Sequence, residues 1–302
     1  MTVEITSPHC GLIAVVGAPN AGKSTLVNAL VGQKVAITSP KAQTTRTRLM
    51  GIAIHGAAQM MLVDTPGIFT PARRLDRAMV QAAWGGTQDA DVIALVVDAK
   101  GGLGTKVEMI LEGLAHRAEP KMLVLNKVDI AAKDKLLSLT TKLLDMCEFE
   151  RILYISAETG EAIAELKAAV AAEMPEGDWH YPEDQISDAT ERLMAAEITR
   201  EQLYLQLHDE LPYASTVETE KYVERDDGSL ELYQQIFVER ESQRAIILGK
   251  GGARIKSIGA TAREEIAKNM GVKVHLYLHV KVKPNWDEDR DVYRDMGLDW
   301  VE

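Results

Sequence analysis

The chain has 302 residues and a mass of 33.2 kDa, which is enough for two domains. No apolar run reaches the roughly 18 residues of a membrane-spanning helix, and the N-terminus lacks a basic-then-apolar signal, so we expect neither a membrane-spanning nor a secreted protein. The net charge of −11 argues against a protein that binds nucleic acid over its whole surface. Two cysteines, Cys10 and Cys147, show no metal-ligand spacing and fit a reducing cytoplasm.

The first half of the chain alternates apolar runs with helix-like stretches. Near-continuous runs rich in β-branched residues are typical of strands buried on both faces of a parallel sheet. We expect a doubly wound α/β domain, in which ligands bind beyond the carboxyl ends of the strands. The apolar runs lie at 12–17, 60–65, 92–99, 122–127 and 152–157.

The periodicity lapses around 174–188, and a different pattern follows it. We therefore divide the chain into a first domain over 1–175, a linker over 176–189 and a second domain over 190–302 with an acidic C-terminal tail. In the second domain the order helix, strand, strand, helix, helix, strand is predicted. The ranges are 190–211, 214–224, 231–240, 242–248, 253–270 and 272–283, with a turn at 225–229.

A glycine-rich stretch, GAPNAGKST, follows the first apolar run and precedes a helical pattern. In this motif the backbone N–H groups cradle phosphates, Lys23 reaches the β- and γ-phosphates, and the Ser24 hydroxyl binds Mg²⁺. The alternative is a glycine-rich turn with a solvated lysine. The candidate nucleotide-binding residues here are Gly17, Ala18, Pro19, Asn20, Ala21, Gly22, Lys23, Ser24 and Thr25.

A second phosphate signal, DTPGIF, ends the 60–65 run. Asp64 can hold the magnesium shell, and Gly67 offers an N–H to the γ-phosphate. Either Thr44 or Thr45, preferably Thr45, completes the metal set of Ser24, Thr45 and Asp64. Many GTPases place a catalytic glutamine after this glycine, but here the residue is Ile68. The stretch adds Asp64, Thr65, Pro66, Gly67 and Ile68 to the nucleotide site.

Two further strand ends favour guanine as the base. The Asp129 carboxylate of NKVD can accept two hydrogen bonds from guanine, which adenine cannot donate, while Asn126 ties this loop to the phosphate loop and Lys127 lies along the base. The backbone after the last run supplies a donor to the guanine oxygen. These residues are Asn126, Lys127, Val128, Asp129, Ser156, Ala157 and Glu158. Four signals in order predict a GTP-binding domain.

The second domain contains a basic segment, although the protein as a whole is acidic. Between residues 240 and 283 there are ten basic and three acidic residues, a balance of 10 − 3 = +7. GKGG lies at its centre, and a G-x-x-G loop lets the sugar-phosphate backbone approach two helix ends. The alternative for GKGG is a plain helix–helix turn. The face of the last strand that carries Lys, His and Tyr is expected to be a solvated sheet face and not a platform for bases. The candidate RNA-binding residues are Arg244, Gly249, Lys250, Gly251, Gly252, Arg254 and Lys256.

These stretches resemble the TrmE–Era–EngA branch of P-loop GTPases, and KAQTTR, DTPG, NKVD, ISAETG and GKGGARIKSIG are similar to those of the Era family over nearly the whole chain. The resemblance implies a type II KH domain, Mg²⁺-dependent GTP hydrolysis, and binding to the 3′ end of small-subunit rRNA in a pre-30S-type particle until hydrolysis releases the protein. It also implies a cytoplasmic monomer and peripheral attachment to the cytoplasmic face of the membrane, for which we find no amphipathic or lipidation signal.

The same resemblance suggests what replaces the glutamine. Some relatives use an asparagine in the phosphate loop to hold K⁺ against the phosphates, so the candidate catalytic residues are Asn20, Lys23, Thr45 and Gly67. The alternative is that Asn20 only caps the loop. Two rival functions stay open: a membrane or cell-cycle signalling switch that acts through a protein partner, and a GTP-dependent RNA-processing enzyme, for which the second domain lacks clustered carboxylates.

Overall fold

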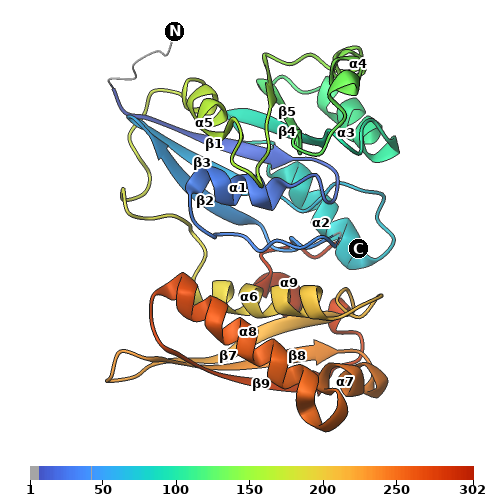
Figure 1. Cartoon of the computed structure of the whole chain (residues 1–302), viewed down its shortest axis with the longest axis vertical. Coiled ribbons are helices and arrows are strands. Elements are labelled where there is room, and N and C mark those ends of the chain that lie inside the picture. The colour runs from blue at the N-terminus through green and yellow to red at the C-terminus, as the bar shows by residue number, and fades with distance from the viewer. Residues whose placement is uncertain (1–6, 42) are drawn as a thin grey trace. The chain divides into compact units, whose positions relative to one another are not determined.

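The computed structural model describes residues 7–41 and 43–302 (Figure 1). It divides into two compact units. The first contains the described residues up to Ala36 together with 45–188 and 296–302, and the second contains residues 37–44 and 189–295. Residues 1–6 of the predicted first domain and Ala42 of KAQTTR lie outside the described residues.

A six-stranded sheet forms the centre of the first unit, in the order β2-β3-β1-β4-β5-β6. β2 runs antiparallel to β3, and the other neighbours are parallel. The strands are β1 (His9–Val16), β2 (Leu49–His55), β3 (Ala58–Asp64), β4 (Val92–Asp98), β5 (Lys121–Asn126) and β6 (Arg151–Tyr154). The predicted α/β class is confirmed.

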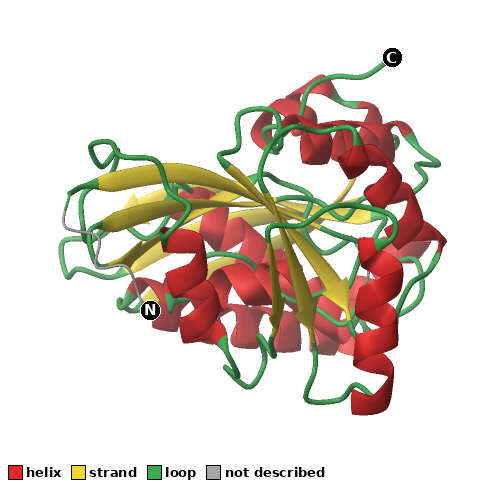
Figure 2. Ribbon diagram, turned by 90° about the horizontal axis from the view of Figure 1, so that it is seen from above, coloured by secondary structure: helices red, strands yellow, loops and turns green. Residues whose placement is uncertain are grey.

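Helices cover both faces of this sheet (Figure 2). α1 (Lys23–Val31) and α5 (Ile163–Ala171) bury their apolar side chains in one core. α2 (Arg74–Gly85), α3 (Thr105–Ala115) and α4 (Lys133–Leu144) contribute to the other. Because the helices cover the faces of the sheet, the carboxyl ends of the parallel strands and the loops that follow them can form the site, as expected of a doubly wound sheet.

The edge strand β2 was not predicted from the sequence. Its residues follow a polar stretch, and the run Leu49–His55 is short enough to pass for part of a loop. The hairpin to β3 turns at Gly56, whose φ of 57° is in the left-handed region that favours glycine. Each residue of β3 is buried because β2 and β1 flank it.

The stretch predicted as a linker, 176–189, belongs to the first unit as far as Asp188. The reason is Gln59, a fully buried side chain of β3. Its Oε1 accepts hydrogen bonds from the backbone of His180 and Tyr181 at 2.9 and 3.0 Å, and its Nε2 donates to the Tyr181 carbonyl at 2.8 Å. The Trp179 indole also donates to the Ala57 carbonyl, at 2.9 Å. Polar side chains thus fix a segment that has no periodicity of its own.

The second unit has the predicted order, with a three-stranded sheet β7-β8-β9. β7 and β8 are antiparallel, and β8 and β9 are parallel. The elements are α6 (Glu191–Gln206), β7 (Ser215–Glu224), β8 (Leu230–Val238), α7 (Glu241–Leu248), the turn η1 (Lys250–Gly252), α8 (Ala253–Met270), β9 (Val274–Val282), η2 (Trp286–Glu288) and α9 (Arg290–Asp295). Within the described residues, none of the helices is long and apolar enough to cross a membrane.

Candidate nucleotide and RNA sites

The phosphate loop links β1 to α1 and closes on a buried lysine. Gly22 has a φ of 93°, and a Cβ there would lie 2.3 Å from the Asn126 side-chain nitrogen, so only glycine fits. Lys23 is 6% exposed, and its Nζ donates to the carbonyls of Gly17 and Ala18 at 3.2 and 3.1 Å. Burial lowers the pKa of Lys23 to about 8, although the Asp64 carboxylate acts in the opposite direction.

Three oxygen atoms converge beside this loop. The Ser24 hydroxyl donates to Asp64 Oδ2 at 2.7 Å and lies 2.8 Å from Thr45 Oγ1, which donates to the same carboxylate oxygen at 3.2 Å. Two hydroxyls and a carboxylate suit Mg²⁺, which prefers oxygen ligands and one or two carboxylates. Thr44 does not join them: its Oγ1 donates to the Lys41 carbonyl at 2.8 Å.

The DTPG stretch lies against the phosphate loop. A Cβ at Gly67 would lie 2.9 Å from the backbone of Pro19, and the Ile68 N–H donates to the Gly17 carbonyl at 3.2 Å. The Ile68 side chain is fully buried in the apolar core that includes Ala14 and Val16. The residue at the glutamine position therefore serves packing and does not face a nucleotide.

Asn126 joins three loops: the predicted tie between its own loop and the phosphate loop, and a contact with the loop after β6 that was not predicted. Its Nδ2 donates to the Ala21 carbonyl at 2.9 Å, and its Oδ1 accepts from the N–H groups of Lys127 and Ala157 at 2.8 and 3.0 Å. Asp129 is exposed, so its carboxylate is accessible to a base. Ser156 is buried and Glu158 is exposed in the turn after β6.

Asp98 lies next to the candidate nucleotide site and was not predicted from the sequence. Lys127 Nζ donates both to Asp98 Oδ2 and to the Asn20 carbonyl, each at 2.6 Å. Burial would raise the pKa of Asp98, but Lys127 and the N–H groups of Gly101 and Lys100 together hold it below its ordinary value. Asp98 ends the run at 92–99, so the strand-end rule could have found it.

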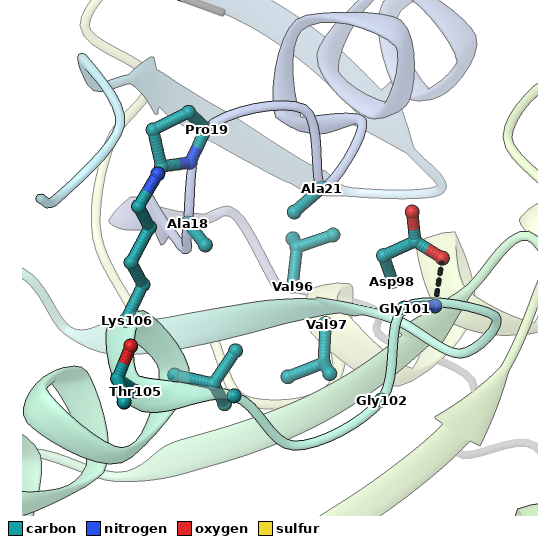
Figure 3. Close-up of a pocket in the computed structure, with 12 residues that line it drawn as sticks. Ala18, Pro19, Ala21, Val96, Val97, Asp98, Gly101, Gly102, Thr105 and Lys106 are labelled. Carbon is teal, nitrogen blue, oxygen red and sulfur yellow. Dashed lines mark hydrogen bonds between the residues drawn. The ribbon is translucent and has the colours of Figure 1, made fainter.

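A pocket of about 290 Å³ adjoins this aspartate (Figure 3). Pro19 and Lys106 lie at one side of the view and Asp98, bonded to the Gly101 N–H at 3.0 Å, at the other. The pocket is lined by the outer side of the phosphate loop, the end of β4 and the start of α3.

In the second unit the GKGG stretch joins α7 to α8. Gly249, Gly251 and Gly252 have φ values of 70°, 61° and 78°, which explains why glycine recurs here. A pocket of about 340 Å³ opens beside the loop. It is lined by Gln206, Gly249, Lys250, Ala253, Arg254 and Ser257.

The remaining predicted RNA residues surround this loop. Arg254 Nη1 donates to the Ile246 carbonyl at 3.3 Å, Lys256 is exposed, and Arg244 forms an exposed ion pair with Glu241 at 3.3 Å. Two residues were not foreseen: Ile246, which is 49% exposed before the loop, and Gln206 of α6. Only the fold brings Gln206 to the loop, whereas the run AIILG already contains Ile246.

Comparison with known sequences gives two family matches and several full-length relatives. Residues 12–127 match the family described as 50S ribosome-binding GTPase, and residues 210–287 match the KH domain. GTPase Era of Erythrobacter litoralis is 59% identical over 305 residues and covers 100% of both chains. GTPase Era of Bradyrhizobium sp. (strain BTAi1) is 57% identical over 97% of this chain and 95% of its own.

Two solved structures have the same fold over nearly the whole chain. A variant of Aquifex aeolicus Era bound to GDP·AlF4⁻ is 38% identical with a TM-score of 0.90, over 96% of this chain and 99% of its own. The second, with the same values, is Era in complex with MgGDPNP and nucleotides 1506–1542 of 16S ribosomal RNA. Both the P-loop sheet and the KH unit thus have counterparts in one protein, and this chain belongs to the Era GTPase family.

Proposed function

We propose that this GTPase is a switch in small-subunit assembly, which binds the 3′ end of small-subunit rRNA in its GTP state and releases it after hydrolysis. The observation that carries the proposal is the pairing of two sites in one chain. The Ser24, Thr45 and Asp64 oxygens converge beside the phosphate loop, and the GKGG loop opens a pocket between basic side chains.

The nucleotide end of the proposal rests on the contacts of the first unit. Lys23 and the phosphate-loop N–H groups bind the phosphates, while Asp129 selects guanine. Ser24, Thr45 and Asp64 would hold Mg²⁺, which when bound neutralises charge that develops on the phosphate oxygens. Gly67, held close to Pro19, donates its N–H to the γ-phosphate.

Without a glutamine to orient the attacking water, hydrolysis depends more on positive charge that stabilises the transition state. We infer that Asn20 helps to hold K⁺ against the phosphates, because Asn20 is an exposed phosphate-loop residue with a left-handed φ of 65°. Asn20→Ala should abolish the stimulation of GTP hydrolysis by K⁺ over Na⁺ and leave the GDP affinity nearly unchanged. Intact stimulation in the variant would limit Asn20 to a structural role in the loop.

The proposed binding of RNA is supported by residues of the KH unit. Lys250 lies within the GKGG loop and Arg254 lies two residues after it, and the glycines of the loop allow close approach of a sugar-phosphate backbone. The related Era structure contains nucleotides of 16S rRNA, which belongs to the small subunit, whereas the description of the matching GTPase family names the large one. The full-length relative supports the small subunit more strongly, because it covers 96% of this chain whereas the family match covers only residues 12–127.

The setting that we propose is a cytoplasmic monomer. Two free, buried cysteines fit a reducing compartment. Peripheral attachment to the cytoplasmic face of the membrane rests on the resemblance alone. Co-sedimentation with anionic vesicles, in the GDP and GTP-analogue states, would test it.

Crosslinking to total cellular RNA, followed by sequencing, tests the assembly role. The protein is loaded in parallel with a non-hydrolysable GTP analogue and with GDP. We expect one single-stranded segment of small-subunit rRNA to be enriched in the analogue state, and the enrichment to disappear in a Lys250→Met/Arg254→Met variant. Equal or scattered crosslinks in both states would overturn the switch on RNA and favour a signalling role through a protein partner.

A further inference from the structure

The segment 37–44, which we call the switch segment, belongs to the second unit although it lies between α1 and β2 in the sequence. The next residue, Thr45, belongs to the first unit and lies in the candidate metal set. The peptide bond between Thr44 and Thr45 is therefore a point at which the chain passes from one unit to the other. Adjacent Cα atoms are about 3.8 Å apart, so a movement of Thr45 must be taken up at once by Thr44.

Helix α6 forms hydrogen bonds with both ends of the switch segment. The Thr38 N–H donates to Glu201 Oε1 at 2.9 Å, and Arg200 Nη2 donates to the Thr44 carbonyl at 2.6 Å. Between these contacts, Lys41 Nζ donates to the Leu207 carbonyl at 2.7 Å and also to the carbonyl of Tyr204.

The Tyr204 hydroxyl in turn donates to the Gln43 carbonyl at 3.1 Å. Most of these contacts involve the backbone of the segment or of the helix end, so they depend on the path of the segment more than on its side chains.

Two of the α6 residues that make these contacts, Arg200 and Glu201, have ionisable side chains, as does Glu197, which pairs with Arg200, and all three are buried. Glu197, Arg200 and Glu201 are 6%, 1% and 3% exposed. Arg200 Nε donates to Glu197 Oε1 at 2.8 Å; burial disfavours the guanidinium charge, but Glu197 more than offsets this and the pKa of Arg200 lies above its ordinary value. Charged groups are rarely buried unless paired, and removing a partner is costly. Release of the switch segment would take a partner from both Arg200 and Glu201.

The same helix leads to the RNA loop. Gln206, at the end of α6, accepts a hydrogen bond from the Ser257 hydroxyl of α8 at 3.0 Å, and both residues line the pocket beside GKGG. Gln206 lies between Tyr204 and Leu207, the two residues whose carbonyls bind Lys41. One end of α6 therefore contacts the switch segment and the RNA pocket at consecutive positions.

We propose that the α6 residues Arg200, Glu201 and Tyr204 are the receptor of the switch segment, through which the state of the nucleotide sets the RNA affinity of the KH unit. The inference rests on the proposed function and adds the residues that couple its two sites. The three act as positioning residues, because their contacts run to the switch segment and to Glu197. Coupling of this kind is reciprocal. If the GTP analogue changes the RNA affinity by a given factor relative to GDP, RNA must change the affinity for the analogue relative to GDP by that same factor.

The double variant Lys41→Met/Tyr204→Phe tests the inference, because it removes three hydrogen bonds between α6 and the switch segment while keeping the bulk of both side chains. The full-length protein is titrated with a fluorescent RNA corresponding to nucleotides 1506–1542 of 16S rRNA, once with GDPNP and once with GDP. The quantity of interest is the ratio of the two dissociation constants. Lys133→Met, an exposed substitution in α4, is the matched control.

We expect the ratio in the double variant to fall about tenfold towards one, since each lost hydrogen bond contributes a factor of roughly two to ten. The affinity for GDPNP without RNA should stay within about twofold. Tyr204→Phe alone should lower the ratio about two- to threefold. This single variant replaces the double variant in the test if the double variant has a markedly lower melting temperature. An unchanged ratio in both variants overturns the inference, whereas a ratio near one in the unmodified protein overturns the proposed switch itself.

Discussion

At the residue scale, Lys23 is a buried cation whose protonation should depend on the nucleotide. Its pKa is lowered to about 8 in the structure, and phosphate oxygens placed against Nζ would raise it again. Binding above about pH 8 must then take up a proton, so the affinity for GTP should fall as the pH rises through 8. Fluorescent GTP titrations between about pH 7 and 9 measure this fall.

Lys23→Arg is the control for that pH dependence, because a guanidinium stays charged throughout the range. Its affinity, though weaker, should vary less with pH than that of the unmodified protein, and the variation that remains reports the ionisation of guanine. Identical pH profiles would show that Lys23 does not titrate. For folding the sign is opposite: the lowered pKa costs stability below pH 8, and the loss is relieved between about pH 8 and 10.5.

Among single residues, those whose roles are assigned by a motif could be predicted even across distant segments, and those that no motif assigns could not. The contact of Asn126 with the phosphate loop follows from its motif, as does the convergence of Ser24 and Asp64. The pairing of Asp98 with Lys127 requires β4 and β5 to be neighbours, which no motif states. The choice between Thr44 and Thr45 also needed the structure, because adjacent residues differ only in the direction of their side chains.

At the scale of elements, the loop between α7 and α8 should contribute charge to RNA binding. Replacing both Lys250 and Arg254 by methionine should weaken RNA binding and reduce the slope of log K against log salt by about 1.4, at roughly 0.7 for each phosphate contact. GTP hydrolysis without RNA should not change. Lys142→Met, on the exposed surface of α4, should leave the slope unaltered. A weaker affinity with an unaltered slope would mean that the two side chains support the loop and do not contact phosphate.

The packing of α6 on the KH sheet includes a buried polar network. Thr199 Oγ1 donates to Gln234 Oε1 at 2.6 Å, and Gln234 Nε2 donates to Thr219 Oγ1 at 3.2 Å. Thr199→Val should destabilise this contact by about 1–3 kcal/mol, because it leaves a buried amide oxygen without that donor. Hydrogen exchange of the β7 and β8 amides should rise accordingly. Adding Gln234→Leu and Thr219→Val should recover much of the loss, and additive losses would contradict the network.

At the scale of the whole molecule, the sequence predicts three consecutive blocks, but the chain is not partitioned that way. It passes between the units near residues 36, 44, 188 and 295. Periodicity reports each element separately, so the sequence alone places residues 37–44 and 296–302 in the blocks around them. Their membership depends on tertiary contacts, such as those of Arg200 with Thr44 and of Arg74 with Trp300.

The C-terminal tail, residues 296–302, belongs to the first unit and should steady the helix that follows DTPGIF. The Arg74 guanidinium, at the start of α2, lies 4.6 Å from the centre of a Trp300 ring, and Met296 and Leu298 are buried. A cation–π contact of this kind contributes about 0.5–2 kcal/mol, so Trp300→Ala should speed hydrogen exchange in α2 by at least about twofold.

Asp299→Asn, an exposed change in the same tail, should leave the exchange of α2 unaltered. Faster exchange only within the tail would mean that the ring covers α2 without steadying it. Faster exchange in α2 would instead mean that the last residues of the chain stabilise the segment next to the γ-phosphate site. Because α2 begins seven residues after Gly67, the tail would then influence the γ-phosphate site. The tail would be a second point, besides the switch segment, at which the later part of the sequence acts on the nucleotide site.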